Sequence, residues 1–155
     1  YAMLLSINAI IVVFLQFWVT RRLQNYKPFL MMAAGCLLYA IGFAMYGFVP
    51  SFALFVMAMI IITIGEMVVS PFQQSLVASF APEDMRGRYM AVSGLSWSIS
   101  FTVGPYFAGL LLESSNPSLL WAFCGLIGTV ATIGFIVLNK VRHDALPVGE
   151  PAAAD

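Results

Sequence analysis

Five long apolar stretches constrain this chain more than any other feature of its sequence. They cover residues 3–20, 28–49, 52–80, 89–112 and 119–139. As an α-helix rising about 1.5 Å per residue, each is long enough to cross, or nearly cross, a hydrocarbon core about 30 Å thick. We therefore expect an all-α membrane protein with five transmembrane helices.

The basic residues are sorted to one side of this predicted membrane. If the chain threads back and forth, the connections at 21–27 and 81–88 share a side with the segment after residue 139. These three segments hold all seven lysines and arginines, namely Arg21, Arg22, Lys27, Arg86, Arg88, Lys140 and Arg142. Because cytoplasmic loops carry an excess of basic residues, this side, including the C-terminus, is expected to be cytoplasmic. The five residues in the two connections are interpreted as anchors at that face.

The composition agrees with a chain buried in lipid. It is 61% apolar and 9% charged, whereas about a quarter of the residues in soluble domains are charged. The net charge of zero gives no reason to expect nucleic acid as a partner. No metal-ligand spacing is present, so neither a metal nor a cofactor is expected. Cys36 and Cys124 lie inside predicted helices, and a disulfide between them is left open.

An odd number of crossings with a cytoplasmic C-terminus places Tyr1 on the far side, at the edge of an apolar helix. The sequence has no initiator methionine and no signal-peptide pattern there. We expect the chain to be the C-terminal part of a longer polypeptide. In this interpretation residues 1–139 form the membrane bundle and residues 140–155 form a disordered cytoplasmic tail.

Glu66 is the only acidic or basic residue deep within any of the five stretches. On a helix turning about 100° per residue, Thr63, Ser70, Gln73 and Gln74 fall within roughly 80° of it. This polar stripe should face water or protein, and not lipid. Ionisable groups inside membranes are functional by default, so Glu66 is interpreted as a site for a proton or a cationic substrate. The alternative is a hydrogen-bonded link between helices.

Three further polar residues are candidates for contact with a substrate. Asn8 lies deep in the first stretch, where an unpaired amide is costly, so it should bind either another helix or a substrate. Ser96 and Ser100 share one face of the fourth stretch and could line a cavity beside the Glu66 stripe. The second and fifth stretches carry little polarity, and they are expected to face lipid.

Two prolines interrupt the predicted helices. Pro71 and Pro105 cannot donate an amide hydrogen bond, so the carbonyls of Met67 and Phe101 lose their usual partner and each helix bends or weakens. These positions could act as hinges or could only fill packing space. The candidates for either role are Pro71, Gly104, Pro105 and Gly109.

The run GEMVVSPFQQSLVASFAPEDMRGRYMAVSGLSWSISFTVGPYFAGLLL, residues 65–112, resembles the C-terminal half of major facilitator superfamily transporters of the bacterial multidrug-efflux type. Arg-Gly-Arg at 86–88 and Gly-Pro-x-x-x-Gly at 104–109 are typical of that set. The resemblance extends to residue 139 and implies helices eight to twelve. The family's basic loop, Asp-Arg-x-Gly-Arg-Arg, is degraded here, because Arg21, Arg22 and Lys27 remain without the aspartate and the glycine.

This resemblance implies a secondary transporter of the bacterial inner membrane that uses the proton gradient and no cofactor. It would export small, hydrophobic or drug-like molecules by alternating access. Its partners would be the lipid bilayer, an N-terminal half of the same transporter and a small-molecule substrate. The alternatives are an uptake symporter of a sugar, peptide or organic acid, or a non-transporting membrane scaffold. An enzyme is not expected, because the only histidine, His143, lies in the tail and no aspartate lies within a helix.

Overall fold

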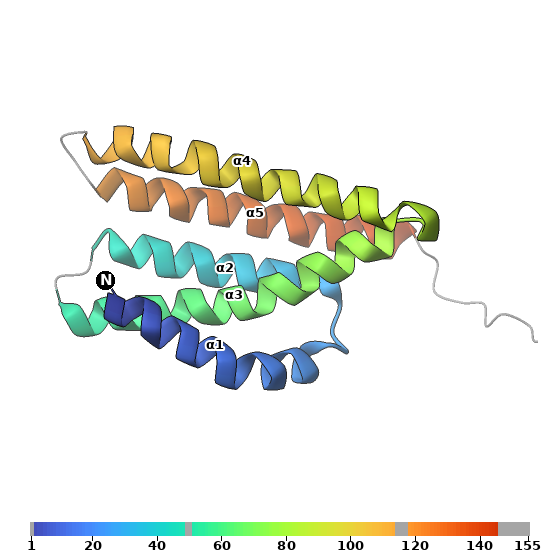
Figure 1. Cartoon of the computed structure of the whole chain (residues 1–155), viewed down its shortest axis with the longest axis horizontal. Coiled ribbons are helices and arrows are strands. Elements are labelled where there is room, and N and C mark those ends of the chain that lie inside the picture. Colours follow the sequence, from blue (N-terminus) through green and yellow to red (C-terminus); the bar gives the residue numbers. More distant parts are fainter. Residues whose placement is uncertain (1, 49–50, 114–117, 146–155) are drawn as a thin grey trace, which may run out of the picture.

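The structure, a computed structural model, describes residues 2–48, 51–113 and 118–145, with side chains from residue 8 to 141 in these ranges and at residue 6. It is a bundle of long helices that run up and down (Figure 1). They are α1 (Ala2–Leu23), α2 (Pro28–Tyr46), α3 (Phe52–Phe80), α4 (Arg86–Leu112) and α5 (Ser118–Ala145), with a short 3₁₀ turn η1 (Glu83–Met85) before α4. No strand occurs in these residues, so the expected all-α fold is confirmed.

Four segments of the described chain are long and apolar enough to cross a membrane. They are Pro28–Tyr46, Phe52–Phe80, Glu83–Leu112 and Ser118–Val141. α1 has 22 residues, which gives it a length of about 33 Å as a helix. Its crossing of the membrane stays a prediction.

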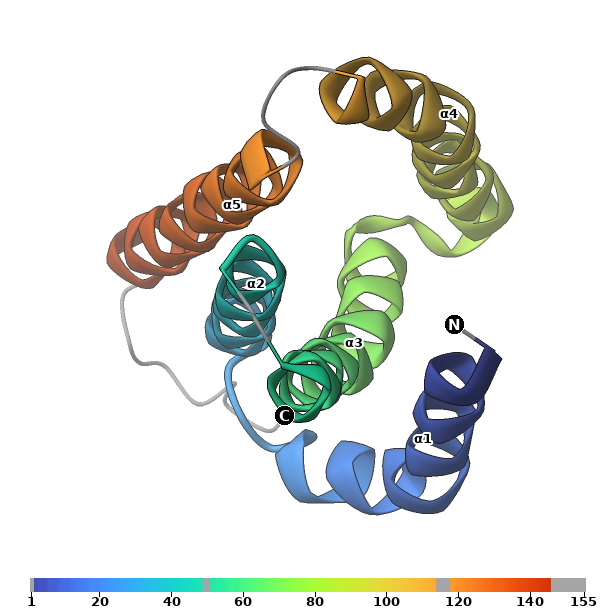
Figure 2. The same cartoon turned by 90° about the vertical axis from the view of Figure 1, so that its left-hand side faces the viewer.

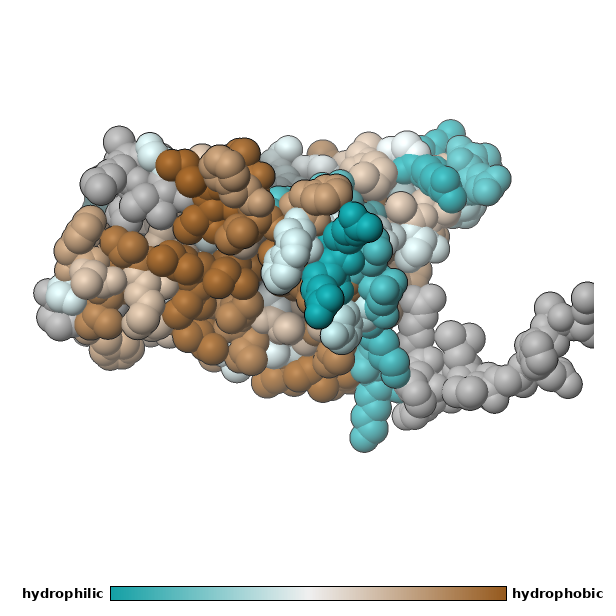
Figure 3. All heavy atoms as spheres, turned by 90° about the horizontal axis from the view of Figure 1, so that it is seen from below, coloured by the Kyte–Doolittle hydropathy of each residue, from teal (hydrophilic) through white to brown (hydrophobic). Residues whose placement is uncertain are grey.

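The helices place the basic residues together. α1 ends, α2 begins, α3 ends and α4 begins at one end of the bundle, as the alternating threading requires (Figure 1). Hydrophilic residues gather at this end while apolar residues cover most of the remaining surface in view (Figure 3). Arg21 and Arg22 lie in the last turn of α1, and not in a loop as expected, where their charge complements the helix dipole.

Local sequence explains where α2 and α3 begin. Pro28 opens α2 at its first turn, where a missing N–H group costs nothing. Ser51 caps α3, because its hydroxyl oxygen accepts a hydrogen bond from the Leu54 N–H group at 3.5 Å. Pro82 follows the end of α3, and the chain turns through η1 into α4.

The fifth helix runs further than the sequence predicted. We expected a disordered tail from residue 140, but α5 continues to Ala145, so residues 140–145 are helical. Extending an existing helix is cheap because nucleation has already been achieved, and polar residues such as Lys140 are good helix formers. Residues 146–155 of the expected tail lie outside the described residues.

α2 lies between α3 and α5 and packs closely against both (Figure 2). Gly35 of α2 faces Gly65 of α3, and Gly128 of α5 faces Ala40 of α2. Small residues on both sides of each contact let the backbones approach. The expectation that this helix faces lipid was therefore wrong for these two sides, because glycines were not interpreted as packing surfaces.

The contacts of α2 with α5 also exclude a disulfide. Ala40 lies opposite Gly128 and Ala44 lies opposite Gly125, so the two helices are antiparallel in a fixed register. Cys124 is then level with Ala44, about 12 Å along the helix from Cys36. Disulfides need Cα atoms within about 7 Å of each other. Both cysteines are free thiols in the structure.

α4 is the least packed helix of the described chain. None of its residues is buried, and its main neighbours are α3, α5 and η1 (Figure 2). A Cβ atom added at Gly94, Gly104 or Gly109 would meet nothing within 4 Å. The small residues of α4 therefore do not serve a close helix contact within the described residues.

We predict that replacing Gly128 with Val destabilises the protein, whereas Gly134→Val on the same helix does not. A Cβ atom at Gly128 would lie 2.9 Å from the Ala40 Cβ atom, while one at Gly134 would meet nothing within 4 Å. Overpacking of this kind costs about 1–3 kcal/mol. Thermal unfolding of the purified protein in detergent should show a clearly lower midpoint for Gly128→Val. Equal midpoints for the two variants would contradict the close α2–α5 contact.

Candidate functional site

Glu66 lies half-buried on α3 and faces α1. The Nδ2 group of Asn8 on α1 donates hydrogen bonds to Thr63 Oγ1 at 2.9 Å and to Glu66 Oε2 at 3.5 Å. Thr63 is fully buried and donates its own hydroxyl to the Met59 carbonyl at 2.9 Å. One amide of α1 thus joins two polar side chains of α3.

The contact between Asn8 and Glu66 is the weaker of the two. A distance of 3.5 Å is at the long limit for a hydrogen bond, whereas 2.9 Å is near the optimum. A carboxylate offers about four positions that can accept a hydrogen bond, and the contact with Asn8 uses one of them. The Glu66 side chain is half-buried in the described part of the chain.

α2 closes a third side of this site. Gly65, next to Glu66, packs against the backbone of Gly35 and Tyr39. Tyr39 is half-buried and stacks on Phe43, with ring centroids 5.8 Å apart. Glu66 therefore lies where α1, α2 and α3 meet. Tyr39 was not predicted to lie near this site, because the second apolar stretch was expected to face lipid.

Gln16 on α1 forms a second link to α3. Its Nε2 group donates to the Met67 carbonyl oxygen at 3.1 Å and to Thr20 Oγ1 at 3.0 Å. This carbonyl is the one that Pro71 leaves without its usual helical partner, and Met67 is only 1% exposed. The sequence identified the freed carbonyl but not its donor. The presence of Gln16 within the apolar stretch 3–20 was the one signal that could have indicated a donor.

The remaining residues of the predicted stripe extend toward the basic end of α3. Ser70 and Gln73 are half-buried and Gln74 is exposed. None of the three forms a hydrogen bond with the described part of the chain. They are not part of the cluster at Glu66, although they share its helix.

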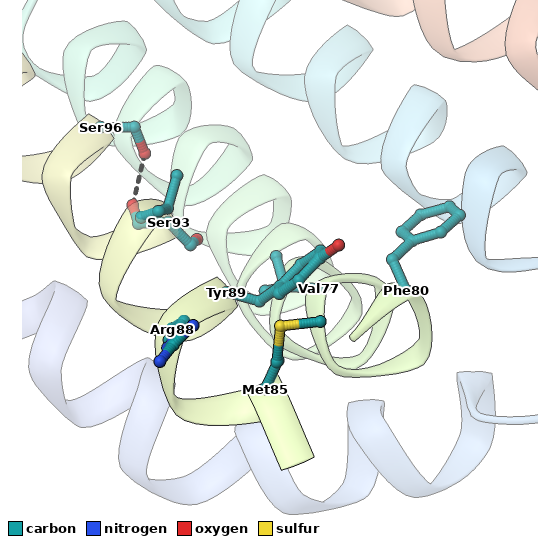
Figure 4. Close-up of a pocket in the computed structure, with 8 residues that line it drawn as sticks. Val77, Phe80, Met85, Arg88, Tyr89, Ser93 and Ser96 are labelled. Atoms are coloured by element: carbon teal, nitrogen blue, oxygen red, sulfur yellow. Dashed lines mark hydrogen bonds between the residues drawn. The ribbon is translucent and has the colours of Figure 1, made fainter. Parts of the chain in front are cut away.

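The serines of α4 lie apart from Glu66. The Ser96 hydroxyl donates to the Ser93 carbonyl at 2.6 Å, and the Ser100 hydroxyl donates to the Ser96 carbonyl at 2.8 Å. Ser93 and Ser96 line a groove of about 660 Å³ against Val77 and Phe80 of α3 (Figure 4). Val77 lies about 16 Å along α3 from Glu66. The expected cavity that joins these serines to the Glu66 stripe is not formed by the described residues.

The two prolines lie inside continuous helices, Pro71 in α3 and Pro105 in α4. Figure 1 shows α3 turning toward the start of α4 in its second half. Pro71 is half-buried beside the α1 contact, whereas Pro105 and Gly104 are exposed on the loosely packed α4.

Residues 1–154 match the Major Facilitator Superfamily. The chain therefore belongs to this superfamily of transporters. It is a multi-pass membrane protein of a transporter family, and not an enzyme.

Several curated proteins are similar to the chain. The MFS-type transporter YdeE of Escherichia coli, described as uncharacterized, is 32% identical over 154 residues, covering 97% of this chain and 37% of that protein. A Na(+), Li(+), K(+)/H(+) antiporter of Planococcus maritimus is 29% identical over 143 residues, 89% of this chain and 32% of that protein. The multidrug resistance protein MdtH of Sodalis glossinidius is 33% identical over 75 residues, 46% of this chain and 18% of that protein.

The chain spans about a third of the length of the first two relatives. No solved structure is similar enough to count as a match.

We predict that Gln16→Leu destabilises the protein by about 1–3 kcal/mol, the cost of leaving a buried carbonyl unsatisfied. In a Pro71→Ala background the same change should cost much less, because the amide of Ala at that position can satisfy the Met67 carbonyl within α3. Thermal unfolding of the four proteins of this double-mutant cycle measures the difference. Additive effects would show that Gln16 does not compensate for the proline.

Proposed function

We propose that this chain forms helices eight to twelve, the C-terminal part, of a proton-coupled transporter that exports small hydrophobic or drug-like molecules by alternating access. The family membership, the five long helices and the greater length of the relatives support this assignment. Two similar proteins carry the names of an antiporter and a multidrug resistance protein. The remainder of the transporter would supply the opposite wall of the cavity.

The position of Glu66 carries the proposal. It is a half-buried carboxyl at the meeting point of three helices, and one long hydrogen bond from Asn8 holds it. A carboxyl that accepts either a proton or a cation at one place makes their occupancies mutually exclusive. Binding of one then promotes release of the other, which is the thermodynamic requirement for exchange. A scaffold would favour a sealed and fully paired carboxyl, which this one is not.

The hydrogen bond to Asn8 links the state of this carboxyl to the helices. An ionised Glu66 attracts the Asn8 amide more strongly than a protonated one, because hydrogen bonds to charged acceptors are shorter and stronger. Asn8 also holds Thr63, so a change of charge at Glu66 redistributes one donor between two acceptors on α3. The contact of α1 with α3 therefore depends on what occupies the site.

A second candidate function is exchange of alkali cations for protons. It is favoured by the relative from Planococcus maritimus, whose match covers 89% of this chain. Uptake by symport is the alternative in the other direction.

An experiment with everted membrane vesicles and a pH-sensitive dye distinguishes drug export, cation exchange and symport. Proton release on addition of a lipophilic cation indicates drug export, release on addition of Na⁺ or K⁺ indicates cation exchange, and neither is expected of a symporter.

We predict that Glu66→Gln in the intact transporter reduces proton-coupled exchange at least about tenfold, because the amide cannot bind or release a proton at neutral pH. Glu113→Gln is the matched control, since it removes an exposed carboxyl at the end of α4. Exchange is measured in vesicles at several pH values after equal expression is verified. Wild-type pH dependence of exchange in Glu66→Gln would overturn the proposed role.

We also propose that the basic end of the bundle is cytoplasmic and that the membrane is the bacterial inner membrane. In a background without native cysteines, Gly87→Cys should react with a membrane-impermeant maleimide only from the cytoplasmic side. Glu113→Cys, at the other end of α4, should react only from outside. The reverse labelling pattern would contradict the proposed topology and indicate the opposite orientation in the membrane.

A further inference from the structure

The groove between α3 and α4 is a built cavity that the transport proposal does not use. It has a volume of about 660 Å³, within the range of about 300–1,000 Å³ that small-molecule sites occupy. α3 contributes Val77 and Phe80, η1 contributes Met85, and the first turns of α4 contribute the remainder of the lining (Figure 4).

The lining combines an apolar floor with one positively charged side chain and a few hydroxyl groups. Val77, Phe80 and Val92 supply apolar surface, and Arg88 is the one charged residue among the lining residues. Arg88 forms no hydrogen bond or ion pair with the described residues, and neither does the Tyr89 hydroxyl. No acidic residue is among the lining residues of the groove, although Glu83 and Asp84 lie in the neighbouring turn η1. A ligand that matches this surface has an apolar body and an anionic group.

The groove lies where such a molecule is abundant. Arg88 is two residues from the start of α4, at the basic end of the bundle, which corresponds to the headgroup level of a membrane. Ser96, at the other end of the lining, is about 12 Å deeper along the helix. The groove therefore extends from the headgroup level into the level of the acyl chains.

The backbone at this end adds to the attraction for an anion. α4 begins at Arg86 without a side chain that caps its first N–H groups. These groups carry the positive end of the helix dipole, which favours a negative charge nearby. Arg88 lies in the same first turn of α4.

We propose that this groove binds an anionic phospholipid of the bilayer, with the phosphate at Arg88 and an acyl chain along Val77, Phe80 and Val92. The proposal rests on the charge and the shape of the groove. It does not depend on the substrate or on proton coupling, so it can fail or succeed separately from the proposed transport function.

The test compares phosphatidylglycerol with phosphatidylcholine of the same acyl chains, bound to the purified protein and counted by native mass spectrometry. We expect wild-type protein to retain phosphatidylglycerol at least about fivefold better, because an arginine near the surface contributes about 1 kcal/mol toward anionic lipid. Arg88→Gln should lose this preference and Arg88→Lys should keep most of it. Arg86→Gln is the matched control, because Arg86 is exposed on the same turn but does not line the groove.

A second variant tests the apolar part. Val92→Trp fills the groove at an exposed position without changing charge, so it should release the lipid while folding is retained. Equal losses in Arg86→Gln and Arg88→Gln would show only diffuse attraction and would overturn the proposal. Displacement of the lipid by glycerol phosphate would overturn it in favour of a soluble anion. Absence of bound phosphatidylglycerol in the wild type would overturn it too, since another part of the polypeptide would then cover the groove.

Discussion

The structure depends on one constraint, that polar groups inside a membrane must find their partners within the protein. Two groups of polar side chains meet it in different ways. The hydroxyls of Ser96, Ser100 and Thr102 return to carbonyls of their own helix, which needs no neighbour. The amides of Asn8 and Gln16 instead reach across to α3. The first solution leaves α4 independent of its surroundings, whereas the second ties α1 to the centre of the bundle.

The helices of the bundle are held together by two kinds of contact, close packing of small residues and hydrogen bonds between side chains and α3. α2, α3 and α5 are held by close backbone approach at small residues such as Gly35, Gly65 and Gly128, where few polar groups take part. α1 meets α3 through side-chain amides that have alternative partners. The glycine contacts leave no room for an added side-chain atom, so these helices are held at one close distance. A side-chain amide, in contrast, can exchange one hydrogen-bond acceptor for another. Glu66 lies between these two kinds of contact, because Gly65 beside it packs against α2 and Asn8 of α1 donates a hydrogen bond to it.

The sequence predicted those features that local composition determines. Helix positions followed from apolar length and from Pro28 and Ser51 at the helix starts, and the sorting of basic residues agrees with the shared end at which they lie. Contacts between distant segments could not be predicted in the same way. Pro71 announces a freed carbonyl, but nothing local indicates that Gln16, more than fifty residues earlier, supplies the donor. The glycines of α2 were likewise ambiguous, because a lipid-facing helix surface and a surface that packs against another helix can have the same composition.

The bond from Gln16 to Met67 has a consequence for the separation of α1 from α3. While Pro71 stands in place, α3 has no backbone N–H group for this carbonyl, so a donor has to come from a side chain or from water. If α1 withdraws, the vacated oxygen needs a new donor or remains unsatisfied in an apolar setting. Water in the gap or the hydroxyl of Ser70, three residues further along α3, could supply it. The energetic cost of separating α1 from α3 therefore depends on whether such a donor replaces Gln16.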